Sequence, residues 1–260
     1  MTVVLSGRAV KSGYNASGLL ILALLVCQPL FPQEQSLRSD AKGYPRYLTD
    51  GAIEIISDRT NQKILGLAAL SAIALHRYDE AVRDYSREDG LIPDELSHRL
   101  DQYGGGWAYP ILLLGVGLKS MGRNDGAARL KYAFTSLVVT GLSTDLIKRA
   151  SRRKRPNGSD ARSFPSGHTS GSFAVAAVVD ELYGQWLGYT AYLAATLVGA
   201  HRIHADKHWL TDVIAGAALG TVIGRGFGIV YREEVENDRI GIVPATTNRT
   251  VSFRIIIPIN

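Results

Sequence analysis

The chain has 260 residues and one cysteine, Cys27, so an internal disulfide is excluded and the length suits a single domain or a compact membrane bundle. Its 29 Lys and Arg residues outnumber 24 Asp and Glu, giving a formal net charge of +5, which favours an anionic partner such as a lipid surface, a nucleic acid or a phosphorylated substrate. Two separate domains are not expected at this length.

The N-terminus has the arrangement of an export signal. Arg8 and Lys11 precede an apolar run over residues 19–26, as in a secretory signal peptide or an uncleaved membrane anchor. We assign this role to residues 1–32 and expect the rest of the chain to be exported. Residues 33–61 are polar and mixed, so they are predicted to form a linker or a peripheral segment.

Apolar stretches further along predict the helices of a bundle. They cover residues 64–75, 107–118, 132–147, 172–182, 186–200 and 209–231. The charged segment 76–102 between the first two has the pattern of an exposed amphipathic helix and loop. Its buried stripe is predicted to be Leu91, Ile92, Leu96 and Leu100.

The lengths of these stretches bear on membrane insertion. A membrane span needs about 20 apolar residues, whereas most runs here are shorter and contain or border charges such as Asp145, Asp180 and Arg225. The mean hydropathy of +0.02 is also low for a protein with many spans. We therefore favour a bundle packed mainly against itself and attached to or resting on a membrane, over an enzyme with six spans.

The C-terminal stretch changes to a period of two. Apolar residues alternate with others over 251–259, which predicts a strand, and residues 240–243 can pair with it across a turn at 245–250. The expected fold is therefore all-α, a helical bundle of about six core helices in residues 33–235. A short C-terminal β-hairpin follows in the tail, 236–260, to which we assign no chemistry.

The stretch from Lys148 to Asp212 holds residue types suited to phosphate chemistry. Lys148, Arg155 and Arg202 supply three positive charges, and arginine forks match phosphate oxygens in a planar, two-pronged way. His208 and Asp212 are four residues apart, so on a helix they share a face. The carboxylate can then hold the imidazole for nucleophilic attack.

A second cluster lies in the tetrapeptide that begins at Pro165. It predicts a tight turn into a helix, where the Ser166 hydroxyl and the Gly167 backbone N–H can converge on an anion. His168 in this turn can protonate a leaving group.

Together these residues resemble the type-2 phosphatidic acid phosphatase superfamily, which also includes class A bacterial acid phosphatases and vanadium haloperoxidases. The superfamily signature reads Lys-x6-Arg-Pro, Pro-Ser-Gly-His and Ser-Arg-x5-His-x3-Asp. The chain carries all of it except the Ser before the last Arg, where His201 stands. The resemblance implies catalytic roles for His208, His168 and Asp212, and phosphate binding by Lys148, Arg155, Ser166, Gly167 and Arg202.

Simpler interpretations of the same residues exist. Taken alone, the basic run 148–155 is more typical of a solvated patch or of a nucleic-acid or membrane contact, but the companion motifs argue against that. Three imidazoles within eight residues also have the spacing of metal ligands: His201, His204 and His208. Because Arg202 and Lys207 lie among them and would repel a cation, we expect no metal and no cofactor.

The predicted function is hydrolysis of phosphomonoesters or diphosphates through a phosphohistidine intermediate, without metal. The favoured substrates are lipid phosphates: phosphatidic acid, phosphatidylglycerophosphate or an isoprenyl diphosphate. The alternatives are a broad-specificity exported acid phosphatase and a vanadate-dependent haloperoxidase. We expect a place in the bacterial cell envelope, on the exported periplasmic side and associated with or anchored to the membrane surface, with no nucleic-acid partner.

Overall fold

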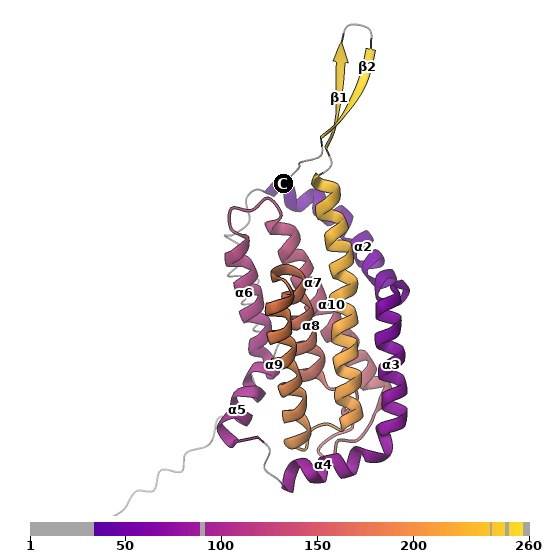
Figure 1. The fold of residues 1–260 in the computed structure, drawn as a ribbon, viewed down its shortest axis with the longest axis vertical. Coiled ribbons are helices and arrows are strands. Elements are labelled where there is room, and N and C mark those ends of the chain that lie inside the picture. Colours follow the sequence, from indigo (N-terminus) through magenta and orange to yellow (C-terminus); the bar gives the residue numbers. More distant parts are fainter. Residues whose placement is uncertain (1–33, 89–91, 240, 248–249, 257–260) are drawn as a thin grey trace, which may run out of the picture.

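A computed structural model describes residues 34–88, 92–239, 241–247 and 250–256. The signal or anchor predicted for residues 1–32 lies outside them. Long helices run side by side over most of this chain (Figure 1). They are α2 (Glu34–Ser57), α3 (Arg59–Leu75), α4 (Asp79–Glu88), α5 (Asp94–Gln102), α6 (Ala108–Ser120), α7 (Gly126–Ser151), α8 (Gly167–Tyr183), α9 (Gln185–His204) and α10 (Leu210–Arg239), with a 3-10 turn η2 (His76–Tyr78) and a π-helical turn η3 (Tyr103–Trp107).

Each apolar stretch predicted to be helical coincides with a helix of the bundle: α3, α6, α7, α8, α9 and α10. The bundle in residues 34–88 and 92–239 is all-helical, as expected. Two predictions were wrong. Residues 34–57, predicted to be a linker or a peripheral segment, form helix α2 of the bundle, because Tyr47 buries its ring against Phe227, with ring centroids 5.6 Å apart. Leu96 of the predicted buried stripe is 41% exposed, whereas Leu100 is buried.

Helix α8 lies between α7, α9 and α10 and contacts all three. Its approach to α10 depends on glycine. A Cβ atom added to Gly220 would lie 2.0 Å from the carbonyl oxygen of Ser170, and one added to Gly216 would lie 2.6 Å from that of Ser166. The two backbones can therefore pack closely only because these positions carry no side chain.

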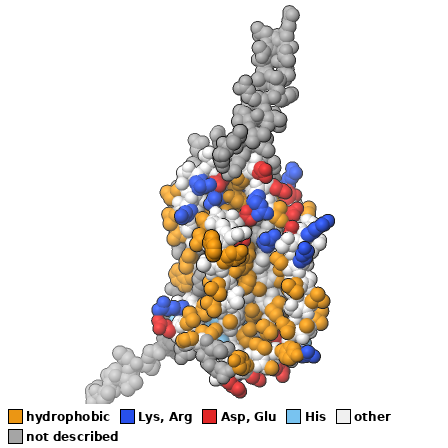
Figure 2. Space-filling model, in the orientation of Figure 1, with side chains coloured by type: hydrophobic (Ala, Val, Ile, Leu, Met, Phe, Trp, Pro, Cys, Tyr) orange, Lys and Arg blue, Asp and Glu red, His pale blue; other side chains and the backbone are white. Residues whose placement is uncertain are grey.

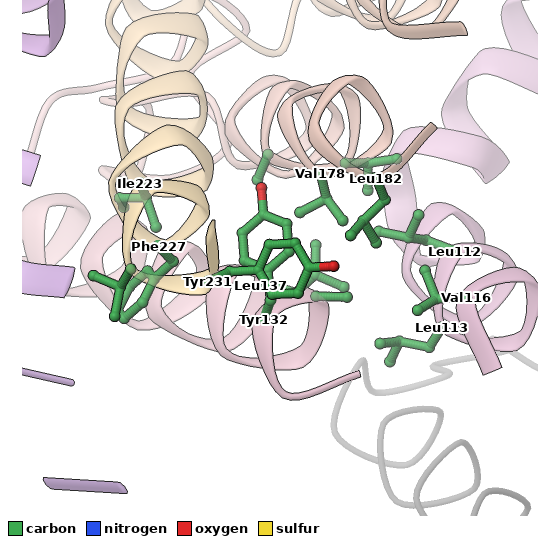
Figure 3. Packing of buried hydrophobic residues seen from close by; sticks show 14 of the residues in the cluster. Leu112, Leu113, Val116, Tyr132, Leu137, Val178, Leu182, Ile223, Phe227 and Tyr231 are labelled. Atoms are coloured by element: carbon green, nitrogen blue, oxygen red, sulfur yellow. The ribbon is translucent and has the colours of Figure 1, made fainter. Parts of the chain in front are cut away.

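The apolar core joins α6, α7, α8 and α10 (Figure 3). Tyr132 of α7 stacks on Tyr231 of α10 with ring centroids 5.2 Å apart. Its hydroxyl donates a hydrogen bond of 2.9 Å to the carbonyl of Gly224, so the one polar atom of this buried ring is satisfied. The core thus holds fixed the helices whose ends carry the sequence motifs.

Beyond α10, strands β1 (Gly241–Thr247) and β2 (Thr250–Ile256) pair antiparallel, with Gly241 opposite Ile256 and Thr247 opposite Thr250. Figure 1 draws this pair at the end of the bundle away from α4 and α5.

Large apolar side chains are exposed around the outside of the bundle. Figure 2 shows them over the middle of the body, with charged side chains gathered toward its two ends. They come from several outer helices and include Leu67, Leu70, Ile73, Ile111, Leu118, Leu142, Leu146, Trp186, Leu187 and Leu193. In the described part of the chain, one helical stretch, Leu210–Glu236 of α10, is long and apolar enough to cross a membrane, yet 56% of its apolar window is buried inside the protein.

Candidate active site

The three motifs meet at the end of the bundle that α4 and α5 cover (Figure 1). The first motif closes α7, the second opens α8, and the third runs from the last turn of α9 into the first turn of α10. Because α7 and α9 end where the antiparallel α8 and α10 begin, residues up to 64 positions apart share one end of the molecule.

The His208 ring lies between a carboxylate and a guanidinium. Its Nδ1 is 3.6 Å from Oδ2 of Asp212, and its Nε2 is 3.5 Å from Nη1 of Arg155. Both His208 and Asp212 are buried. A proton on Nδ1 would face the carboxylate and leave the lone pair of Nε2 directed at Arg155, and such contacts in substrate-free sites often change when substrate binds.

Asp212 is fixed by donors on every side. Its Oδ2 accepts hydrogen bonds from the Ser163 hydroxyl and from the backbone N–H of Trp209 at 2.9 Å, and its Oδ1 accepts one from Nη1 of Arg153 at 2.7 Å. Burial alone would raise the pKa of Asp212, but its contacts with His208, Ser163 and the Trp209 N–H, with the charge of Arg153, lower it instead. Asp212 is therefore an ionised partner for the histidine.

Arg153 links this carboxylate to a second one outside the motifs. Its Nη2 donates to Oδ2 of Asp79 at 2.6 Å, and its Nη1 also donates to the Thr211 hydroxyl at 2.7 Å. Asp79 in turn accepts from the backbone N–H of Thr211 at 3.0 Å. The first turn of α4 is thereby joined to the first turn of α10.

Two of the predicted phosphate-binding cations flank His208. Arg155 is oriented by Asp160 at 2.8 Å and by the carbonyl of Lys207 at 3.2 Å. Lys148 donates to the carbonyl of Arg162 at 2.7 Å. Burial, with the charge of Arg155, lowers the pKa of Lys148 to about 8, so it still carries its proton at neutral pH.

Ser166 and Gly167 begin α8 beside these cations. The backbone N–H of Ser166 donates to the carbonyl of Asp212 at 2.9 Å, and its hydroxyl accepts from Thr169 at 2.8 Å. The backbone N–H of Ser166 is thus used by the fold. Because the Ser166 hydroxyl acts as an acceptor for Thr169, its own proton remains available for donation. A Cβ added to Gly167 would lie 3.6 Å from Cε of Lys148, so the lysine passes directly over this turn.

Arg202 and His168 form the other side of the site. The Nη1 of Arg202 donates to Oδ1 of Asp101, and the Nε2 of His168 is 3.6 Å from the same oxygen. Among the described residues, nothing hydrogen-bonds to the buried Nε of Arg202. A buried donor of this kind suits an anion.

The three imidazoles with metal-like spacing point to different partners. Nδ1 of His201 is 3.0 Å from the Ser97 hydroxyl, and Nδ1 of His204 is 2.7 Å from the carbonyl of Ser86, whereas His208 faces Asp212. Across the described ranges, no three His, Cys, Asp or Glu side chains lie close enough together to hold one metal ion.

The region that holds the three motifs matches a known protein family. Residues 129–235, which include all three motifs, match the PAP2 superfamily. This part of the chain belongs to the PAP2 superfamily. The expected resemblance is therefore confirmed.

Relatives of the PAP2 region are curated as lipid phosphatases. A protein named lipid A 1-phosphatase from Porphyromonas gingivalis is 34% identical over 113 residues, covering 42% of this chain and 25% of that protein. Another protein of that name, from Rhizobium etli, is 34% identical over 116 residues, covering 38% of this chain and 49% of that protein. The matches thus span a quarter to about half of these relatives.

A solved structure has a similar fold. The transmembrane PAP2-type phosphatidylglycerolphosphate phosphatase from Bacillus subtilis is 20% identical, with a TM-score of 0.56, covering 69% of this chain and 98% of that one.

The surroundings of the PAP2 site lower the pKa of both His168 and His208 below that of an ordinary imidazole. Burial lowers the pKa of His208 to about 4; the contact with Asp212 opposes the shift, and Lys148, Arg155 and Arg202 reinforce it. Burial and the charge of Arg202 also lower the pKa of His168, against the effect of Asp101. Both rings are therefore neutral in the empty site, and an arriving phosphate dianion would favour the protonated form of His168.

Four side chains of the PAP2 site were not predicted from the sequence: Asp79, Asp101, Arg153 and Ser163. The last two lie between motif residues, so their position in the stretch 148–212 was an available signal. Asp79 and Asp101 lie in the segment 76–102 that was predicted to be an exposed helix and loop. Their contacts bridge 74 and 101 positions of the chain, and no local pattern records such a pairing.

Proposed function

We propose that this protein is a lipid phosphate phosphatase that works through a phosphohistidine on His208. The observation that carries the proposal is a buried, neutral imidazole with a buried carboxylate at one nitrogen and a guanidinium beside the other. Asp212 and Arg155 supply these two groups. This is the arrangement of an activated nucleophile that faces an anionic substrate.

In the first step, Nε2 of His208 attacks phosphorus and the bond from phosphorus to the ester oxygen breaks. The departing oxygen takes a proton from His168, which is protonated once the phosphate dianion is bound, so a phosphomonoester releases a neutral alcohol and a diphosphate releases the protonated monophosphate ester. In the second step, water attacks the phosphohistidine while the now neutral His168 accepts its proton. Phosphate leaves, and both histidines return to their starting states.

The cations stabilise the transferring group. Charge spreads over its equatorial oxygens, and catalysis of such transfers is mainly positioning and electrostatic stabilisation. Nη1 of Arg155 lies 3.5 Å from Nε2 of His208, and the charges of Lys148, Arg155 and Arg202 all help to lower the pKa of His208. We assign them, with the Ser166 hydroxyl and the Gly167 N–H, to phosphate binding, and the mechanism calls for no metal and no cofactor.

Two observations favour a lipid substrate. The relatives are named for lipid A and other lipid phosphates, and large apolar side chains are exposed around the bundle, as on proteins that contact membranes. We therefore propose phosphatidic acid, phosphatidylglycerophosphate, an isoprenyl diphosphate or the 1-phosphate of lipid A as substrate, presented at a membrane surface.

The organisation of the chain follows from this proposal. Residues 1–32 serve as signal or anchor, residues 33–235 form the phosphatase domain, and residues 236–260 form a peripheral tail with no assigned chemistry. The protein acts on the exported side of the bacterial envelope, associated with the membrane.

The test is turnover of the purified full chain in detergent, with EDTA present, on those four lipids and on p-nitrophenyl phosphate. We expect lipid turnover to exceed that of the soluble ester. His208→Ala should abolish both turnover and the acid-labile, base-stable label left by a radioactive phosphoryl group, while the exposed His98→Ala serves as a matched control. A label that persists in His208→Ala contradicts the nucleophile, and a preference for p-nitrophenyl phosphate supports a broad acid phosphatase instead.

A further inference from the structure

Asp101, on a helix that carries none of the motifs, contacts residues of both α8 and α9 on the Arg202 and His168 side of the site. A single oxygen, Oδ1, accepts a hydrogen bond from Nη1 of Arg202 and lies 3.5 Å from Nε2 of His201 and 3.6 Å from Nε2 of His168. His201 and Arg202 are buried, whereas the Asp101 side chain is 54% exposed at the edge of the site. A carboxylate therefore stands between a proposed general acid and a proposed phosphate ligand.

The position of this carboxylate is enforced by its surroundings. Nδ1 of His201 is 3.0 Å from the Ser97 hydroxyl, one helical turn before Asp101, so one imidazole faces α5 at two points. Immediately after α5, the backbone packs on His168: a Cβ on Gly104 would lie 3.3 Å from both Cβ and the ring atom Cδ2 of His168 and 2.6 Å from Cγ1 of Val198. Helix α5 is thus held against α8 and α9.

His201 stands where the superfamily signature has serine. A serine side chain is too short to reach from α9 to both Ser97 and Asp101. The histidine that replaces the signature serine therefore makes the contact that positions the Asp101 carboxylate.

Asp101 is ionised in this position. Its interaction with His201 lowers the pKa of its carboxyl, against the effect of burial, and the charges of Arg202 and His168 lower it further. The arrangement repeats that of the nucleophile, because His208 and Asp212 are also separated by 3.6 Å.

We propose that Asp101 is the positioning residue for His168. Its carboxylate accepts a hydrogen bond from the Nε2–H group of His168, turns Nδ1 toward the substrate and stabilises the imidazolium that donates to the leaving group. The same carboxylate orients Arg202 for phosphate. This inference rests on the proposed function and adds a second histidine–carboxylate pair to it.

The other charges around His168 make this partner necessary. Arg202 and His201 of α9, and His208 in the turn before α10, all disfavour a proton on His168, whereas Asp101 favours one. Asp212 of α10 is directed at His208, and Lys148 of α7 donates to the carbonyls of Arg162 and Ser163. Without Asp101, His168 would face cations and imidazoles until the phosphate arrived.

The test is Asp101→Asn, with Glu95→Gln as control, because Glu95 is an exposed carboxylate on the same helix that pairs with Arg99. Removing the negative charge should lower the pKa of His168, so the basic limb of the kcat profile should move to lower pH. On an alkyl phosphate we expect kcat to fall tenfold or more, part of the roughly 10²–10⁴-fold that proton donation contributes. On p-nitrophenyl phosphate, whose leaving group needs little help, the fall should be smaller.

Two outcomes would overturn the proposal. An unchanged kcat with a lower KM would mean that Asp101 merely competes with phosphate for Arg202, and an equal fall on both esters with no shift of the profile would mean a purely structural role. Asp101→Glu keeps the charge and should retain the basic limb, which covers the case in which the asparagine variant folds poorly.

A readout independent of turnover separates this inference from the proposed function. The pKa of His168 can be followed by NMR of isotope-labelled histidine with inorganic phosphate or vanadate bound. It should fall in Asp101→Asn and stay unchanged in Glu95→Gln, and an unchanged value in both variants contradicts the pairing. A phosphohistidine label that persists in His208→Ala, together with the expected fall of the His168 pKa in Asp101→Asn, would count against the nucleophile alone.

Discussion

Arg153 offers the sharpest test of how the site is held together. It is the shared donor to two buried carboxylates, Asp79 and Asp212, with contacts of 2.6 Å and 2.7 Å. Arg153→Met removes the cation but keeps most of the aliphatic stem, which leaves both carboxylates facing each other. Removing one partner of a buried ion pair typically costs about 3–5 kcal/mol, because the remaining charge stays desolvated.

The expected change is measurable by thermal unfolding. For a chain of this size each 1 kcal/mol shifts Tm by roughly 2–4 °C, so Arg153→Met should lower Tm by roughly 6–20 °C in far-UV circular dichroism at neutral pH. Asp79→Asn in the same background should restore part of the loss, with a coupling of about 0.5–3 kcal/mol in a double-mutant cycle. Arg149→Met, in the same basic run but in an exposed pair with Asp145, is the control and should leave Tm unchanged.

The pH dependence supplies a second check. The folded-state pKa of Asp212 lies below its unfolded value, so its contribution to stability is complete above the unfolded pKa of about 3.8 and is lost as pH falls through the folded value. The destabilisation by Arg153→Met should therefore be largest at neutral pH and should shrink in acid, where the carboxylates become protonated. A Tm for Arg153→Met equal to that of Arg149→Met would refute the reasoning, since it would mean that solvent already compensates both carboxylates.

Three further predictions follow from the packing and the site. Gly220→Ala should destabilise the fold by about 1–3 kcal/mol, because its Cβ would lie 2.0 Å from a carbonyl oxygen of α8, whereas Gly141→Ala, with open space around its Cβ, should be neutral or stabilising in the same unfolding assay. His168→Ala should reduce turnover of an alkyl phosphate far more than that of p-nitrophenyl phosphate at matched pH, and an equal fall on both would assign the ring to phosphate positioning. The acid limb of the kcat/KM profile should lie near pH 4, which is the pKa of His208 in the substrate-free enzyme, because protonation removes the attacking lone pair. An acid limb near the ordinary histidine pKa would contradict the conclusion that burial lowers the pKa of His208.

The local patterns of this chain predicted both the helices and the motif residues, for the same physical reason. A helix has a short repeat, so apolar runs revealed α3 and α6 to α10, and the four-residue spacing of His208 and Asp212 anticipated their shared site. The order and spacing of three motifs were enough to assemble the predicted site, since antiparallel helices of similar length return their ends to the same place.

Tertiary structure alone decided the partners of those residues and which apolar side chains are exposed on the surface. Arg153 meets Asp79 across 74 positions and Arg202 meets Asp101 across 101, and pairing over such separations has no repeat from which it can be read. The burial of a side chain cannot be read from the sequence either. Leu70 is 67% exposed and Leu112 only 7%, although both lie in apolar helices. The sequence by itself predicted which side chains carry the chemistry, whereas the packing of α4, α5 and α9 determined which charges surround them, because desolvation and ion pairing depend on neighbours in space and not in the chain.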